Sequence, residues 1–222
     1  MERWEEHFAE TLFRRSGDTA HDLKTPLNIG VLNLELLRMR SRKLDQNGTE
    51  DEKLEAYARA IDTELRRLAS IFDAFFVYSV PPRGEEGPKL VDAVAPLSGA
   101  GTRVGIAMPE EGPAMVYAHA SRIDALSKMF FDGISRLVVS GKAEVSFSRT
   151  NGSIVLRVEG PLSHENDELG KVFKFYYTDP AGAPELSLAV ARLIAETYGG
   201  TITADQPEGN AVVELTLPVE ER

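Results

Sequence analysis

Residues 21–28 read HDLKTPLN and run directly into IGVLNLELLRMR, an amphipathic pattern that predicts one long helix with a proline in its interior. Pro26 cannot donate a backbone hydrogen bond and its ring clashes with the preceding turn, so we expect the helix to bend just beyond His21. An interior proline costs a helix about 3 kcal/mol. We therefore interpret Pro26 as a residue that shapes the surface beside His21.

Apolar residues recur with a seven-residue rhythm in two segments that flank a short polar stretch. Because that stretch, LDQNGTEDE (residues 44–52), contains Asn-Gly, the two segments should form an antiparallel helical hairpin. Such spacing is typical of helices that pack side by side at a shallow angle. Two helices leave too much apolar surface exposed, so we predict a homodimer that closes a four-helix bundle. The seam positions are Phe13, Ala20, Leu23, Leu27, Gly30, Leu34 and Leu37 in the first segment and Leu54, Ala58, Ile61, Leu65, Leu68, Phe72 and Phe75 in the second.

The composition changes after Tyr78, where SVPPRGEEGP is rich in proline, glycine and charge and predicts a linker. The later segments predict one sheet covered on one face by helices, so the expected fold class is α+β. We place the hairpin at 1–80, the linker at 81–88 and a second domain at 89–222. Within it we expect a strand at 102–108, a helix at 121–139, a β-hairpin at 143–160 turning at Asn151-Gly152, a helix at 186–200 ending at Gly199-Gly200, and a closing β-hairpin at 201–218.

Composition excludes several classes of function. The formal net charge of −10 and the pI of about 5.0 argue against a nucleic-acid partner, which rewards a basic surface. The absence of cysteine excludes disulfides, thiolate zinc sites and cysteine nucleophiles. We find no convincing cluster of metal ligands. No apolar run is long enough to span a membrane, and the charged N-terminus does not resemble a signal peptide, so we expect a cytoplasmic protein.

The first helix carries the candidate chemistry. Leu23 and Leu27 are seam residues, which places His21 and Thr25 outside the seam and leaves the histidine exposed. Asp22 follows His21, and a carboxylate beside an imidazole can accept one ring proton and leave the other nitrogen nucleophilic. Cationic residues nearby could anchor an acidic partner. They are Arg14, Arg15 and Lys24.

The motif HDLKTPLN resembles the H box of sensor histidine kinases, in which His is followed by Asp or Glu, two further residues, Thr or Asn, and then Pro-Leu. The resemblance implies that His21 is phosphorylated on a ring nitrogen and that Asp22 assists proton removal. It also implies that Thr25 positions water or phosphoryl in the reverse reaction. The partners it implies are the receiver domains of response regulators.

The second domain resembles the α/β sandwich that binds ATP in the same family, but its chemical residues are mostly replaced. The metal-binding asparagine corresponds to Asp132, and the adenine-reading aspartate falls at or near Glu159. The glycines of the phosphate loop correspond to Pro184, Glu185 and Ser187. Proline has no N–H and glutamate brings a negative charge, so neither suits a triphosphate. We therefore expect ATP binding to be lost.

The resulting hypothesis is a dimeric histidine phosphotransferase derived from a histidine kinase. His21 would carry a phosphoryl group between receiver aspartates, with no cofactor of its own and with magnesium supplied by the receiver. Two alternatives are an active ATP-dependent sensor histidine kinase with a divergent nucleotide site, and a non-catalytic adaptor that binds receivers. A measurement of nucleotide binding distinguishes the first alternative from the phosphotransferase. Loss of function on replacing His21 distinguishes the phosphotransferase from the second alternative.

Overall fold

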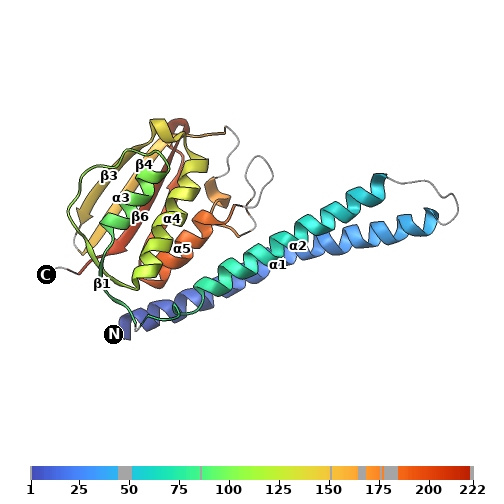
Figure 1. Ribbon diagram of the computed structural model, residues 1–222, viewed down its shortest axis with the longest axis horizontal. Helices are drawn as coiled ribbons and strands as arrows, with labels where there is room; N and C mark the ends of the chain where they lie inside the picture. Colours follow the sequence, from blue (N-terminus) through green and yellow to red (C-terminus); the bar gives the residue numbers. More distant parts are fainter. Residues whose placement is uncertain are drawn as a thin grey trace.

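The computed structural model describes residues 2–44, 52–85, 87–150, 152–164, 169–175, 177 and 185–220. A long helical hairpin projects from an α/β unit, and the N-terminal part of the hairpin lies against that unit (Figure 1). The hairpin consists of α1 (Glu2–Leu44) and α2 (Glu52–Tyr78), as predicted, and α1 continues through Pro26. Most of the predicted 44–52 connection lies outside the described residues. No helix in the described part of the chain has the length and apolarity that a bilayer span requires.

The row of residues buried within the hairpin is displaced by one position from the predicted seam. On α1 the buried residues include Thr19, Asp22 and Pro26, whereas Leu27 keeps 51% of its surface exposed. Leu65, on α2, is likewise 56% exposed. A single chain therefore leaves part of the predicted seam uncovered. The large residues of that seam that stay exposed are Phe13, Leu27, Leu34, Leu65 and Phe72. On α2 the buried residues are Glu64, Arg67 and Ile71 instead.

The second unit is a four-stranded antiparallel sheet in the order β3-β4-β6-β5, with α3, α4 and α5 on one face (Figure 1). A separate two-stranded sheet, β1-β2, precedes it. The strands are β1 (Lys89–Asp92), β2 (Met115–Ala118), β3 (Glu144–Thr150), β4 (Ser153–Pro161), β5 (Thr201–Asp205) and β6 (Asn210–Pro218). The α-helices are α3 (Val94–Arg103), α4 (Ala120–Leu137) and α5 (Ser187–Thr197), and the short 3₁₀ turns are η1 (Ser140–Lys142), η2 (Leu169–Lys171) and η3 (Pro207–Gly209).

Both predicted β-hairpins and the glycine end of α5 are confirmed. Gly152, between β3 and β4, has φ +76°, a value that side chains rarely tolerate. Gly199 has the same φ and donates its N–H to the Glu196 carbonyl at 3.1 Å. A Cβ on Gly200 would lie 2.5 Å from the Thr216 carbonyl oxygen of β6. Glycine is thus required where α5 turns into the sheet.

The strand predicted at 102–108 is wrong, because the helix α3 occupies Val94–Arg103 and the chain beyond it is irregular. The sequence did not indicate this helix, because it contains Pro96 and two glycines. The proline lies in the first turn, where no intrahelical donor is lost. Gly101 packs closely against Met108, since a Cβ there would lie 2.3 Å from Met108 Sδ.

The N-terminal arm of α1 packs along α5 through an aromatic cluster. Trp4 stacks on Tyr198 with centroids 6.3 Å apart and meets His119 edge-on at 5.2 Å. His119 Nδ1 and the Tyr198 hydroxyl are hydrogen-bonded at 2.7 Å. Further along, Thr11 Oγ1 donates to the Glu196 carbonyl at 3.1 Å. The arm is thereby tied to the second unit.

Acidification should loosen this contact. Burial lowers the pKa of His119, against a smaller opposing effect of Glu85, so the folded chain holds this imidazole in its neutral form. A depressed pKa gives stability that is complete above the unfolded value of about 6.5 and is lost as the pH falls below it. Thermal unfolding followed by Trp4 fluorescence should therefore shift to lower temperature between about pH 7.5 and 5.5. His119→Gln should flatten that dependence, and an unchanged slope would contradict the assignment.

Candidate functional site

The imidazole of His21 projects from α1 with 79% of its side chain exposed, which confirms the predicted exposure. Its neighbour Asp22 is buried. Asp22 Oδ1 lies 3.4 Å from His21 Nδ1, a long contact, while Oδ2 accepts a hydrogen bond from the Phe175 backbone N–H at 3.1 Å. One carboxylate therefore connects the histidine to the second unit.

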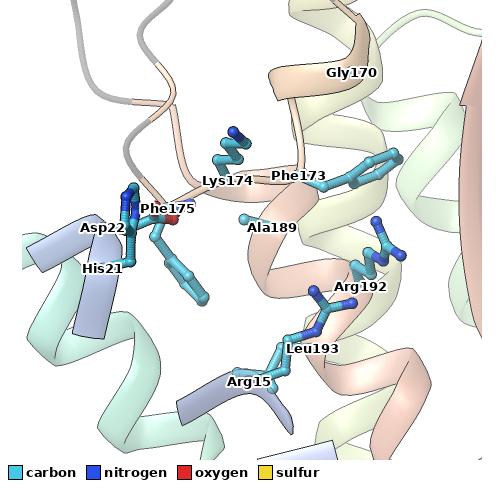
Figure 2. Close-up of a pocket in the computed structure, with 10 residues that line it drawn as sticks. All are labelled: Arg15, His21, Asp22, Gly170, Phe173, Lys174, Phe175, Ala189, Arg192 and Leu193. Carbon is cyan, nitrogen blue, oxygen red and sulfur yellow. Dashed lines mark hydrogen bonds and ion pairs between the residues drawn. The ribbon is translucent and has the colours of Figure 1, made fainter. Parts of the chain in front are cut away.

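A pocket of about 240 Å³ opens beside these residues, between α1, α5 and the segment that follows η2. Figure 2 shows His21 and Asp22 on one side, Arg192 on the other, and Lys174 between them along one edge. Arg192 also stacks on the Phe173 ring at 4.9 Å. The lining residues are Arg15, His21, Asp22, Gly170, Phe173, Lys174, Phe175, Ala189, Arg192 and Leu193.

A buried carboxylate on α5 gathers the arginines next to the pocket. Glu196 accepts hydrogen bonds from Arg15 Nε at 2.8 Å and Arg192 Nε at 2.9 Å, and it pairs with Arg14 at 3.1 Å. Burial alone would raise the pKa of the Glu196 carboxyl, but the hydrogen bonds and charges of Arg15 and Arg192 hold it below its usual range. The cluster fastens α1 to α5.

This cluster changes the interpretation of the basic residues predicted to bind a partner. Arg15 is only 16% exposed and is engaged within the chain. Arg14 keeps 58% of its side chain exposed despite its ion pair with Glu196. Lys24 is exposed on α1, one turn beyond His21. Of the three predicted cations, Arg14 and Lys24 thus remain accessible at the surface.

The other predicted residues of the helix flank the histidine. Thr25 is half-buried on the turn after His21, and Pro26 is buried beside it. Since Pro26 has no N–H, the Asp22 carbonyl one turn earlier lacks its helical donor. The motif thus places a nucleophile, a carboxylate and a hydroxyl on two adjacent turns.

The described residues among those predicted at the degenerate nucleotide site lie on α4, on β4 and at the start of α5. Asp132 is half-buried on α4. Glu159 lies on the sheet face away from the helices, where it pairs with Arg157 at 2.8 Å, and that contact lowers the pKa of the carboxyl. The strand position that faces the helices is its neighbour Gly160, which has no side chain to read a base.

Glu185 stands where α5 begins, and Pro184 lies outside the described residues. Glu185 is only 5% exposed, accepts the Ser187 N–H at 2.7 Å and forms an ion pair with Arg136 of α4. Nearby, α4 and α5 are in direct contact, since a Cβ on Gly133 would lie 2.5 Å from Leu188 Cγ. The chain's own carboxylate thus uses an N–H at the helix start that could otherwise face an anion.

Among the residues that the structure describes, no group of three or more His, Asp or Glu side chains is arranged to hold a metal ion. Sequence reasoning missed Lys174, Phe175, Arg192 and Glu196. Only the i, i+4 spacing of Arg192 and Glu196 signals a pairing along the sequence. Nothing local indicates that Glu196 also meets Arg15.

Residues 16–79 match the model of a family described as the His Kinase A (phospho-acceptor) domain. This span includes His21 and most of both hairpin helices. A search of curated proteins found no match.

Three solved structures share the fold. The Acinetobacter baumannii histidine kinase AdeS has a TM-score of 0.50 and 17% identity, and the alignment covers 90% of this chain and 98% of that one. The mycobacterial sensor histidine kinase MprB has a TM-score of 0.50 and 17% identity, with coverage of 61% and 99%. Full-length ShkA, solved in complex with AMPPNP, has a TM-score of 0.50 and 14% identity, with coverage of 89% and 46%. At these identities the likeness is one of fold.

Proposed function

We propose that this chain belongs to the histidine kinase family and acts there as a histidine phosphotransferase, because part of it matches the His Kinase A (phospho-acceptor) domain and its fold is similar to that of solved histidine kinases. His21 accepts a phosphoryl group from one receiver aspartate and passes it to another. The observation that carries the proposal is an exposed His21 in a chain whose Glu185, which the sequence comparison aligned with the phosphate loop, accepts the Ser187 N–H at the start of α5.

In the first transfer, the lone pair of His21 Nε2 forms a bond to phosphorus. The P–O bond to the receiver aspartate breaks, and its electron pair leaves with the carboxylate. The ring then releases its Nδ1 proton, which Asp22 Oδ1, 3.4 Å away, is placed to accept. The second transfer reverses these steps, with Thr25 positioning the phosphoryl group. Magnesium in the receiver's acidic pocket neutralises charge, so this chain mainly provides position.

The proposal includes a homodimer, in which two hairpins close a four-helix bundle. The support is the band of apolar side chains that one chain leaves exposed along α1 and α2. Removing such a band from water is favourable in proportion to its area. Its members include Leu27, Val31 and Leu34 on α1 and Leu65 and Phe72 on α2.

Loss of ATP binding is supported by the start of α5. An incoming triphosphate would meet the buried carboxylate of Glu185 in place of free amide groups, and bringing like charges together in a buried site is costly. The side chain of Leu188, packed against Gly133, fills the space where α4 meets α5. A nucleotide would have to displace both.

Calorimetric titration with AMPPNP, up to millimolar concentration and with magnesium present, is expected to give no heat of binding. ShkA, whose structure contains AMPPNP, provides the positive control under the same conditions. A micromolar site in this chain would contradict the proposal and favour an ATP-dependent kinase.

A further inference from the structure

The pocket beside His21 concentrates positive charge in a chain whose formal net charge is −10. Three cations line it, namely Arg15, Lys174 and Arg192, and Asp22 is the single acid among its lining residues. Arg15 and Arg192 share the carboxylate of Glu196. The remaining cation is Lys174, which is exposed and has no carboxylate partner among the residues that the structure describes.

The position of Lys174 is fixed relative to His21 through the backbone. The next residue, Phe175, is buried and donates its N–H to Asp22 Oδ2 at 3.1 Å, and Asp22 is the direct neighbour of His21. One hydrogen bond therefore holds the backbone next to Lys174 close to the His21–Asp22 pair. Figure 2 shows Lys174 between the His21–Asp22 pair and Arg192.

We propose that this pocket is an anion site that receives the phosphoryl group carried by His21, with the Lys174 ammonium as its counter-ion. The inference rests on the proposed function. A volume of about 240 Å³ is ample for a phosphoryl group, since a water molecule takes about 30 Å³ in the liquid. An ammonium beside a phosphoryl oxygen forms a charge-assisted hydrogen bond and favours the more ionised phosphoryl group. The pocket walls also limit the access of water to phosphorus.

The test compares the wild-type chain with Lys174→Gln, which removes the charge and keeps a similar length. Both are phosphorylated with phosphoramidate, a donor that needs no receiver, and the phosphohistidine is followed by ³¹P NMR against pH. The second ionisation of the phosphoryl group should occur at lower pH in the wild type than in K174Q. The half-life of the phosphohistidine should be about threefold longer in the wild type, because a partly exposed ion pair stabilises by an energy that corresponds to about this factor. Lys128→Gln, an exposed lysine of α4 outside the pocket, should behave as the wild type.

If the phosphoryl titration and the phosphohistidine half-life are the same in the wild type and K174Q, the proposed anion site is wrong. The proposed function is then unaffected. If His21 takes up no label from phosphoramidate or from a receiver, the proposed function fails, and inorganic phosphate becomes the probe. A shift of the His21 ring resonances on adding phosphate, lost in K174Q but kept in K128Q, supports the anion site. No shift overturns it.

Discussion

His21→Ala is expected to abolish phosphoryl uptake from a phosphorylated receiver while leaving the dimer and the helix content unchanged. The side chain is 79% exposed, so its removal opens no cavity in the core. His21→Gln should fail equally, because an amide keeps polarity but has no nucleophilic ring nitrogen. Uptake is measured as acid-labile, base-stable label on the chain, and dimerisation and helix content by light scattering and circular dichroism.

His164→Ala is the matched control, because it removes another exposed histidine from a different part of the chain. That variant should take up label as the wild type does. If His21→Ala still accepts label, the H-box resemblance does not describe the chemistry of this helix, and the non-catalytic adaptor becomes the better account.

Leu65→Glu is expected to convert the dimer to monomers. Leu65 is 56% exposed in a single chain, so the hairpin itself should tolerate the change. In a closed bundle the same carboxylate would be buried without a partner, at a cost of at least about 3 kcal/mol. That cost weakens dimerisation more than a hundredfold. Sedimentation velocity across a range of micromolar concentrations measures the shift directly.

Thr63→Glu provides the control, since it adds the same charge to the same helix about 200° around its axis. Thr63 is exposed, and this variant should remain a dimer. A wild-type chain that sediments as a monomer at micromolar concentration would contradict the bundle, as would an L65E variant that dimerises normally.

Local patterns explain why much of the fold could be predicted. The seven-residue rhythm specifies the hairpin, and Gly152 and Gly199 mark turns that need positive φ. The helix α3 was not predicted because proline and glycine usually indicate a loop. Here Pro96 lies in the first turn of the helix, and Gly101 makes a close contact with Met108. The seam was displaced by one residue because the rhythm defines a broad apolar stripe and does not specify which edge faces the partner helix.

Part of the candidate site could likewise be predicted from local sequence, and part could not. The H box is contiguous, so His21, Asp22 and Thr25 could be read directly from the sequence. The contacts that join α1 to the second unit connect distant residues, such as Asp22 with Phe175 and Arg15 with Glu196. No pattern in a single sequence reveals such pairs. Glu159 shows a different difficulty, because one step of strand register moves a side chain to the opposite face of the sheet.

In the proposed function, the phosphoryl group on His21 comes from a receiver and not from ATP. Two parallel incubations of the purified chain test it, one with ATP labelled at the γ-phosphate and one with a receiver that carries a labelled aspartyl phosphate. We expect no label on the chain in the first reaction and label that depends on His21 in the second. Label on His21 from ATP alone would contradict it.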